Sequence, residues 1–523
     1  MPQAELLETV SRNKWEKIGA KKRAGLLVPL FSVYSQDSLG IGELFDLKLV
    51  IDWADKTGLS IIQLLPMNDL GSLFCPYDGL SSFALEPSYL SIKAIPGASK
   101  IKARISEAGI KFPTAGRYVD YGIKKEKLSL LWHIFLMDET HQSQAFADFV
   151  SGNSYWLKDF ALYKVLKNYH ECRPWYEWPK EHKNRDKQAL DNFYHEHKRK
   201  IIFQQWLQWL IFQQFKSVKQ YAKEKNILLK GDLPILVSRD SADVWAHTDY
   251  FKLDFASGAP PDMYCASGQR WGMPTYDWAR IGFDNYIYLK EKLRYAQEFY
   301  DILRVDHVVG LFRIWSINYN EPKENQGLHG FFDPHDERLW RQHGKNLLNL
   351  FLSHTNMLLC AEDLGMIPKE CPQTLKELGI PGNDVQRWAK DWNARHDFLL
   401  PDEYRSLSVA MLSTHDTTNW PAWWENEAGT VDEPLFIRKC HEKQIDYPNL
   451  KEKLFDPGLS RHNRLRWSKV VDSPDSLARI LGRKGKTAQG QTNLSRHKGR
   501  ITSPNHSSAK AGLSRARFYP PSQ

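Results

Sequence analysis

The sequence of 523 residues lacks long apolar runs and closely spaced cysteines. No apolar stretch approaches the roughly 18–20 residues that a transmembrane helix requires. The first seventeen residues also lack the apolar segment of a secretory signal. Six scattered cysteines without a CxxC pair are typical of a reduced protein and not of a disulfide scaffold. These absences predict a cytoplasmic globular protein.

Acidic residues are absent from one segment. Residues 481–523 carry nine Lys or Arg and no Asp or Glu, which leaves 62 basic and 62 acidic residues in 1–480. The net charge of +9 therefore comes from this tail. Its Ser-, Gly- and Arg-rich composition predicts a poorly ordered end, and binding of nucleic acid to it is the less favoured alternative.

Aromatic residues, in contrast, are abundant, with 25 Phe, 22 Tyr and 19 Trp. Core packing explains most of them. Trp and Tyr also line sugar-binding clefts, because their flat apolar faces match the C–H faces of pyranose rings.

Six short apolar runs end in polar residues, which is typical of strands buried on both faces of a parallel sheet. A helical pattern over 43–58 ends in Gly58, and residues 124–226 read as a long helical insertion. This alternation predicts an α/β fold, a (β/α)8 TIM barrel with an insertion at about 68–226 and a loop rich in aromatic residues at about 254–278. The predicted strands are GLLVPLFS (25–32), IIQLLPM (61–67), KGDLPILV (230–237), ILRVDHV (302–308), LLCAEDL (358–364) and SVAMLSTHD (408–416).

Three of these runs end in an acid, at Asp306, Glu362 and Asp416. The carboxyl ends of barrel strands meet at one face, so the three acids are expected at one mouth. Arg304 shares a strand face with Asp306 and is expected to keep it ionised, whereas apolar neighbours are expected to raise the pKa of Glu362. One ionised and one protonated carboxyl are what glycosidic bond cleavage requires.

The sequence resembles the 4-α-glucanotransferases called amylomaltases or disproportionating enzymes, which form glycoside hydrolase family 77. The resemblance covers about 25–467 and rests on several blocks. They are SQDSLGIGE (35–43), CPYDGLSSFALEP (75–87), GDLPILVSRDSADVW (231–245), PPDMYCASGQRWGMPTYDW (260–278), RVDHVVG (304–310), AEDLGMIP (361–368), GNDVQRW (382–388) and STHDTTNW (413–420).

The resemblance implies a role for each acid. Asp306 would be the nucleophile, with Arg304 orienting it, and Glu362 would be the general acid/base. Asp416 would stabilise the transition-state sugar, with His415 beside it. The implied reaction is a retaining double displacement that moves α-1,4-glucan segments between maltooligosaccharides, with the two carboxyls roughly 5–5.5 Å apart.

The resemblance also implies substrate contacts. Asp232 would be a structural and sugar-contacting residue, and Tyr77 would contact glucan near the cleaved bond. Tyr264, Gln269 and Trp271 lie in the loop that arches over the bound chain in the family. The donor would be a maltooligosaccharide or other α-1,4-glucan, and the acceptor glucose or a maltooligosaccharide. No metal or organic cofactor is implied.

Two departures from the family pattern bear on these expectations. Met273 stands in WGMP where the family usually has WGNP, and the tail keeps only GRITSP as a trace of the family's closing segment. A replaced terminus would mean that the last strand of the barrel is missing or poorly formed, so the barrel would not close. An α-glucan hydrolase and an inactive glucan-binding protein are therefore the alternative functions.

Overall fold

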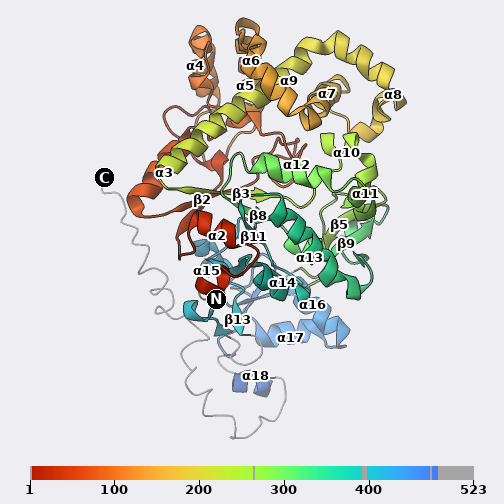
Figure 1. The fold of residues 1–523 in the computed structure, drawn as a ribbon. Coiled ribbons are helices and arrows are strands. Elements are labelled where there is room, and N and C mark those ends of the chain that lie inside the picture. The colour runs from red at the N-terminus through yellow and green to blue at the C-terminus, as the bar shows by residue number, and fades with distance from the viewer. Residues whose placement is uncertain (1–2, 263–264, 392–396, 472–473, 481–523) are drawn as a thin grey trace. The chain divides into compact units, whose positions relative to one another are not determined.

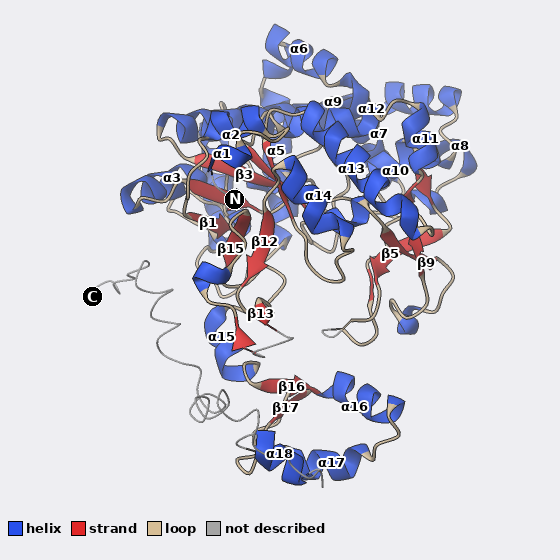
Figure 2. Ribbon diagram, turned by 60° about the horizontal axis from the view of Figure 1, so that its bottom comes forward, coloured by secondary structure: helices blue, strands red, loops and turns tan. Residues whose placement is uncertain are grey.

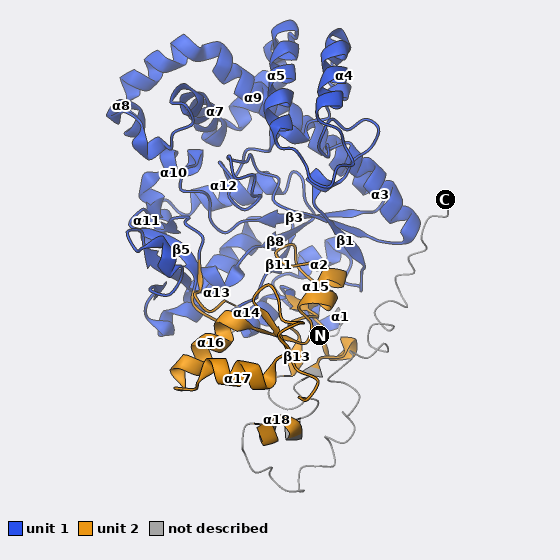
Figure 3. Cartoon of the chain, turned by 180° about the vertical axis from the view of Figure 1, so that it is seen from behind, with its two compact units in different colours: residues 1–259, 270–382 blue, residues 260–269, 383–523 orange. Residues whose placement is uncertain are grey.

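A computed structural model describes residues 3–262, 265–391, 397–471 and 474–480. The predicted basic tail, 481–523, and Tyr264 lie outside the described residues. The chain divides into two compact units, the first comprising 1–259 and 270–382 and the second 260–269 and 383–523 (Figure 3).

Five parallel strands form the centre of the first unit (Figure 1). Each begins inside or beside a predicted apolar run, so these five predictions are confirmed. Their order is the chain order, which is the arrangement that successive βα units produce. The strands, in order across the sheet, are β1 (Gly25–Val28), β2 (Ile61–Leu64), β3 (Leu228–Leu233), β8 (Ile302–Val305) and β11 (Leu358–Ala361).

Burial along the strands differs from the expectation at one edge. All four residues of β8 and of β11 are buried, but Leu26 in β1 is 39% exposed. Among the described residues β1 pairs with β2 alone, so one of its sides is not covered by a neighbouring strand. Complete burial therefore holds for β8 and β11, although β11 is also an outer strand of this sheet, and does not hold for β1.

Helices follow the strands as the pattern predicts. The helix expected over 43–58 is α3 (Asp46–Thr57), and Gly58 ends it with a left-handed φ of 75°. Gly231 in β3 is required for packing, because a Cβ there would lie 2.4 Å from the ring of Tyr300. The other helices of the βα units are α12 (Ile287–Ala296), α13 (Glu337–Ser353) and α14 (Glu370–Leu378), and the chain begins with α1 (Gln3–Leu6) and α2 (Arg12–Ile18).

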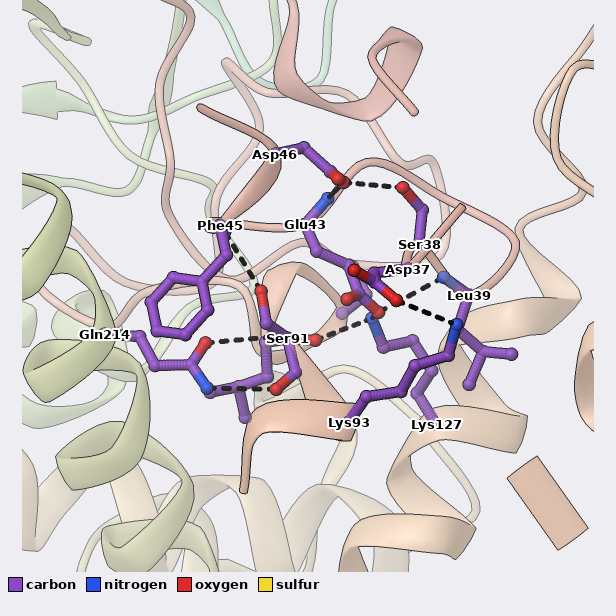
Figure 4. Close-up of polar contacts among 12 residues, drawn as sticks. Asp37, Ser38, Leu39, Glu43, Phe45, Asp46, Ser91, Lys93, Lys127 and Gln214 are labelled. Atoms are coloured by element: carbon purple, nitrogen blue, oxygen red, sulfur yellow. Dashed lines mark hydrogen bonds and ion pairs between the residues drawn. The ribbon is translucent and has the colours of Figure 1, made fainter. Parts of the chain in front are cut away.

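Between β2 and β3 the chain is largely helical. The longest helix buries the predicted stripe Leu207, Ile211, Phe215 and Val218 completely. Gln214 on this helix pairs with both backbone groups of Ser91, at 2.8 and 3.1 Å, as a strand neighbour would (Figure 4). The helices are α4 (Lys102–Lys111), α5 (Gly122–Met137), α6 (Gln144–Gly152), α7 (Ser154–Tyr169), α8 (Lys180–Lys183) and α9 (Lys187–Glu224).

The SQDSLGIGE block is fixed to this insertion by a buried ion pair. The Lys127 ammonium, on α5, lies 2.6 Å from the Glu43 carboxylate and also donates to the Leu90 carbonyl at 2.8 Å (Figure 4). Asp46 accepts from the Ser38 hydroxyl and the Glu43 amide, each at 2.7 Å. The polar residues of this block therefore stabilise the fold around the first βα unit.

The segment 254–278 differs from the expected continuous loop, because it contains short strands. Within the first unit, β5 pairs antiparallel with β9 (Figure 2). These elements are β5 (Phe255–Ala259), β6 (Gln269–Arg270), β7 (Thr275–Tyr276), β9 (Ile314–Asn318) and β10 (Phe331–Asp333), with β4 (Phe251–Lys252), α10 (Ala242–Ala246) and α11 (Trp278–Phe283) nearby in sequence.

The second unit contains the last predicted strand as β15. Its residues are half-buried or exposed, unlike the buried strand expected, because β15 belongs to a two-stranded sheet with β12. A small apolar cluster of Leu454, Phe455, Leu465 and Val471 packs separately. The elements are β12 (Gly382–Val385), β13 (Lys390–Asp391), β14 (Asp397–Phe398), β15 (Ser408–Met411), α15 (Trp420–Asn426), β16 (Thr430–Asp432), α16 (Glu433–Glu442), α17 (Tyr447–Leu454), β17 (Arg464–Arg466) and α18 (Pro474–Ile480).

Candidate active site

Two acids leave neighbouring parallel strands side by side. Val305 on β8 pairs with Ala361 on β11, so the next residues, Asp306 and Glu362, continue the same row. The Glu362 amide donates to the Val305 carbonyl at 3.0 Å. Parallel pairing thus brings together two residues that are far apart in the sequence, at the carboxyl edge of the sheet.

One arginine contacts both of these acids and a third. Arg304 Nη1 donates to both oxygens of Asp232 at 2.7 Å and to Asp306 Oδ1 at 2.9 Å. Arg304 Nη2 lies 3.7 Å from Glu362 Oε1. The guanidinium is 3% exposed, and burial strengthens its interaction with each carboxylate. The apolar setting expected for Glu362 is therefore incomplete, because this arginine reaches Glu362 from the adjacent strand.

Tyr77 joins the same network. Its hydroxyl donates to Asp232 Oδ2 at 2.7 Å and lies 3.4 Å from Arg304 Nη1. Burial and the charge of Asp232 raise the pKa of Tyr77 well above its usual value, so the hydroxyl stays protonated. The structure thus brings three of the predicted site residues, Tyr77, Asp232 and Arg304, together, and glucan contact by Tyr77 and Asp232 stays a prediction.

The pKa of Asp306 differs from the expectation. Burial and the neighbouring Glu362 raise the pKa of Asp306 well above its usual value, although Arg304 opposes them. Two carboxyls that share one cation this closely cannot both ionise easily, so the pair retains a proton to higher pH than either would alone. The prediction that Arg304 keeps Asp306 fully ionised is corrected to a pair that shares a proton.

The sequence reasoning did not single out His307, which is held in an unusual conformation beside the pair. Its φ of 44° and ψ of 52° are left-handed, and its amide donates to Glu362 Oε2 at 2.6 Å. Burial lowers the pKa of His307 to about 4, so the imidazole is neutral at pH 7. The Trp271 ring meets it edge to face at 4.7 Å, which places this predicted residue next to the acids. Strained backbone at such a position is typical of functional sites.

The remaining predicted residues belong to the second unit. His415 Nε2 lies 3.1 Å from Asp416 Oδ1, and the Asp416 side chain is 68% exposed. Gln269 is exposed at the start of β6. The convergence of Asp416, His415 and Gln269 on the Asp306–Glu362 pair stays a prediction.

A second buried charge cluster, also missed from the sequence, anchors residues 69–82, here called the Tyr77 loop. Asp69 lies 2.9 Å from the Lys124 ammonium and 2.6 Å from that of Lys164, and its side chain is fully buried. Burial alone would raise the pKa of Asp69, but the two lysines lower it to about 2. The only signal in the sequence was an acid following an apolar run.

The cluster holds the loop by its backbone. Lys124 donates to the Leu70 carbonyl at 2.7 Å, and the Leu70 amide donates to Glu86, which also pairs with Lys124 at 2.7 Å. At the other end, the Ser82 amide donates to Asp243 at 2.5 Å. Both ends of the loop that carries Tyr77 are therefore fixed by buried carboxylates.

We expect Lys124→Met to lower the free energy of unfolding by roughly 3–5 kcal/mol, because Asp69 and Glu86 lose a buried partner. Urea denaturation at pH 7 measures this. The lowered pKa of Asp69 means that its contribution is complete above about pH 4 and is lost as the pH falls toward about 2.

The matched control is Lys111→Met. Lys111 is 65% exposed and lies 3.1 Å from Glu126 in the same insertion. An exposed pair contributes at most about 1 kcal/mol. Equal losses in the two variants would contradict a structural role for the buried cluster.

Within the described ranges, no group of three or more His, Cys, Asp or Glu side chains is placed to hold a metal ion. In the same residues, no helix has the length and apolar character needed to cross a membrane. Two neighbouring carboxyls at strand ends form the kind of pair that glycoside-processing enzymes use, and here a buried arginine contacts both. The site thus points to this class of enzyme.

Comparisons with known proteins identify the family. Residues 28–483 match glycoside hydrolase family 77, described as 4-alpha-glucanotransferase. The 4-alpha-glucanotransferase of Chlamydia pneumoniae is 36% identical over 424 residues, which cover 80% of this chain and 78% of that protein. The 4-alpha-glucanotransferase of Chlamydia trachomatis serovar D is 36% identical over 474 residues, covering 90% and 86%.

A solved structure shows the same fold. The amylomaltase from Streptococcus agalactiae in complex with acarbose aligns with a TM-score of 0.67 at 22% identity, covering 89% of this chain and all of that one. The chain therefore belongs to the 4-alpha-glucanotransferase family, and it is a glycosyltransferase-type enzyme acting on α-glucans. Its fold is the α/β fold of the amylomaltases, and the resemblance seen in its motifs is confirmed.

Proposed function

We propose that the protein transfers segments of α-1,4-glucan between maltooligosaccharides, with Asp306 as nucleophile and Glu362 as general acid/base. The observation that carries the assignment is the contact of Arg304 with both carboxyls, at 2.9 and 3.7 Å. In this proposal the proton that the pair shares is on Glu362 when the glucan binds, because Arg304 makes its shorter contact with Asp306. This distribution is the one that the first chemical step needs.

The reaction then proceeds in two displacements. Glu362 gives its proton to the glycosidic oxygen as Asp306 Oδ attacks C1, so the C1–O bond breaks and a β-linked glycosyl-enzyme forms. The leaving glucan departs with a new 4-hydroxyl group. Glu362, now ionised, removes the proton from the 4-hydroxyl of an acceptor glucan, which attacks C1 and releases Asp306. The configuration at C1 is retained.

Other residues have supporting roles in this proposal. Arg304 and Asp232 hold Asp306 in place, and Tyr77 contacts the glucan near the cleaved bond. Asp416 and His415 bind the hydroxyl groups of the reacting sugar. Tyr264, Gln269 and Trp271 cover the glucan and exclude water, which favours transfer over hydrolysis.

The proposal includes a finer architecture and setting. The fold is a (β/α)8 TIM barrel within 1–480, with the insertion at about 68–226 and a covering segment at about 254–278. All six cysteines are free, which supports a reduced, cytoplasmic location. The partners are an α-1,4-glucan donor and a glucose or maltooligosaccharide acceptor, and the basic tail has no nucleic-acid role.

Incubation with maltotriose tests the proposed function. We expect free glucose together with a ladder of longer maltooligosaccharides, because the acceptor sugar replaces water in the second displacement. Chromatography of the products and a reducing-end assay measure this. Steadily rising reducing ends without longer products would favour a hydrolase, and binding to amylose without any product would favour an inactive glucan-binding protein.

A further inference from the structure

We propose a second glucan-binding surface, formed by Tyr176, Arg239 and Tyr319 and here called the Tyr–Arg platform. It would bind sugar units of the same α-1,4-glucan chain beyond those at the cleaved linkage. This inference rests on the proposed function and deepens it, because it makes the enzyme favour longer glucans.

The platform combines two rings with one guanidinium. The Arg239 guanidinium carbon lies 3.7 Å from the centroid of the Tyr319 ring and 5.7 Å from that of Tyr176. Tyr319 is 38% exposed, and Tyr176 is half-buried. Burial and the nearby Tyr319 raise the pKa of Tyr176 to about 12, so its hydroxyl remains a hydrogen-bond donor. Partly exposed tyrosine rings and hydroxyl groups suit the apolar faces and polar edges of pyranose rings.

Residues of the helical insertion hold the backbone at Arg239 and Asp240 in place. The Trp175 indole, 4% exposed, donates to the Arg239 carbonyl at 2.8 Å. The Trp175 amide and the Tyr163 hydroxyl donate to Asp240 at 3.1 and 2.8 Å. These bonds fix Tyr176 and Arg239 on adjoining backbone segments, so little conformational entropy is lost when a ligand binds.

The Tyr319 side is held by another arginine. Arg270 donates from Nη2 to the Tyr319 carbonyl at 2.6 Å and from Nη1 to the Glu321 carbonyl at 2.5 Å. Arg239 Nη1 donates to the Leu253 carbonyl at 2.8 Å. Both arginines are therefore oriented by backbone carbonyls, and the Arg270 guanidinium carbon lies 5.9 Å from the centroid of the same Tyr319 ring. This environment suits a neutral polyhydroxyl ligand, with the other N–H groups of Arg239 directed to its hydroxyls.

One hydrogen bond links the chain segment of Arg239 to the segment of Tyr77. Arg239 lies on the chain that continues from Asp232 at the end of β3. Its neighbour Ser238 donates a hydrogen bond to Asp78, and Asp78 follows Tyr77 in the Tyr77 loop. This hydrogen bond thus joins the segment that carries Arg239 to the segment that carries Tyr77. A glucan extending from Tyr77 along the β3 loop would reach the platform.

The test compares Tyr319→Ala and Tyr176→Ala with Tyr118→Ala as the matched control. Tyr118 is 79% exposed and also has an arginine, Arg117, over its ring at 5.3 Å, but it lies elsewhere on the insertion. For each protein, kcat/KM is measured with maltotriose and with maltoheptaose. In the platform variants we expect the loss for maltoheptaose to exceed the loss for maltotriose by about tenfold, the size of one good ring contact.

Further variants separate binding from folding. Tyr319→Phe keeps the ring and should keep most of the preference for maltoheptaose, and Tyr118→Ala should change neither value. An unchanged ratio in Tyr319→Ala, or equal losses with both substrates, would overturn the platform while leaving the proposed function intact.

Binding supplies a readout that is independent of turnover. In the Asp306→Asn background, calorimetry with maltoheptaose should show about tenfold weaker binding when Tyr319→Ala is added. Unchanged affinity would reject the platform even if the protein proved not to be a transferase. A failure of the unsubstituted protein to act on maltotriose would instead count against the proposed function alone.

Discussion

Asp306→Asn should reduce transfer from maltotriose by roughly 10⁴-fold or more, because an amide cannot form the glycosyl-enzyme. The substitution keeps the size of the side chain, and Arg304 keeps its two bonds to Asp232. Product formation over long incubations measures the residual rate. The variant should still bind maltooligosaccharides, because it loses only the nucleophile and keeps the other residues of the site.

Thermal unfolding gives this prediction a second readout. A carboxyl whose pKa is raised by folding destabilises the folded state above its ordinary pKa, because folding then opposes its ionisation. Removing the charge at pH 7 should therefore leave the melting temperature of Asp306→Asn unchanged or raised. Asp191→Asn, at an exposed position on α9, is the matched control and should keep full activity. Comparable activity in Asp306→Asn and the unsubstituted protein would remove the nucleophile assignment.

Glu362→Gln should reduce transfer from maltotriose by about 10²–10⁴-fold, the usual contribution of general acid–base catalysis. The loss should depend on the leaving group, which distinguishes this role from a structural one. An α-maltosyl fluoride needs no proton to release fluoride, so the first displacement should remain fast. The second displacement lacks its base, and a glycosyl-enzyme should accumulate, which mass spectrometry of the intact protein detects.

Azide provides the complementary measurement for Glu362→Gln. It attacks C1 as an anion without needing a base, so it should restore turnover of the fluoride and yield an α-glycosyl azide. Glu324→Gln, an exposed change in the short 3-10 helix Lys323–Asn325 of the same unit, should use maltotriose and the fluoride as the unsubstituted protein does and should gain nothing from azide. If Glu362→Gln lost activity equally with maltotriose and the fluoride, without any azide product, Glu362 would not be the acid/base.

These two experiments also address how the pair shares its proton. Arg304 Nη1 is 2.9 Å from Asp306, whereas Nη2 is 3.7 Å from Glu362, so removing either acid changes the charge seen by the other. With Asp306 neutralised, Glu362 becomes the easier group to ionise, since like-charge repulsion is gone. The pH dependence of maltooligosaccharide binding by each variant reports the change in the pKa of the remaining acid.

Sequence patterns alone located the parts of the catalytic pair. Apolar runs of four to eight residues identified β8 and β11, and the acids that follow them, Asp306 and Glu362, stand at the carboxyl ends. Hydrophobic periodicity likewise predicted the buried stripe of α9, including Ile211 and Phe215. These features are local, because strand and helix periodicity are written in consecutive residues.

The tertiary structure decided which charges meet. Arg304 contacts Glu362 and Asp232 because three different strands lie in register, and no local pattern encodes that register. The pKa of Asp306 depends on this meeting, and so the expectation drawn from Arg304 alone was incomplete.

The same holds for Lys124 with Asp69. An isolated lysine on a helix predicts a solvated face, and only the packing of the insertion on the Tyr77 loop buries it with a partner. The sequence by itself determined the five strands of the central sheet, the main helical segments and the chemical types at the strand ends. Burial and charge pairing came from contacts between distant segments, because electrostatic energies depend on distance and on exclusion of water.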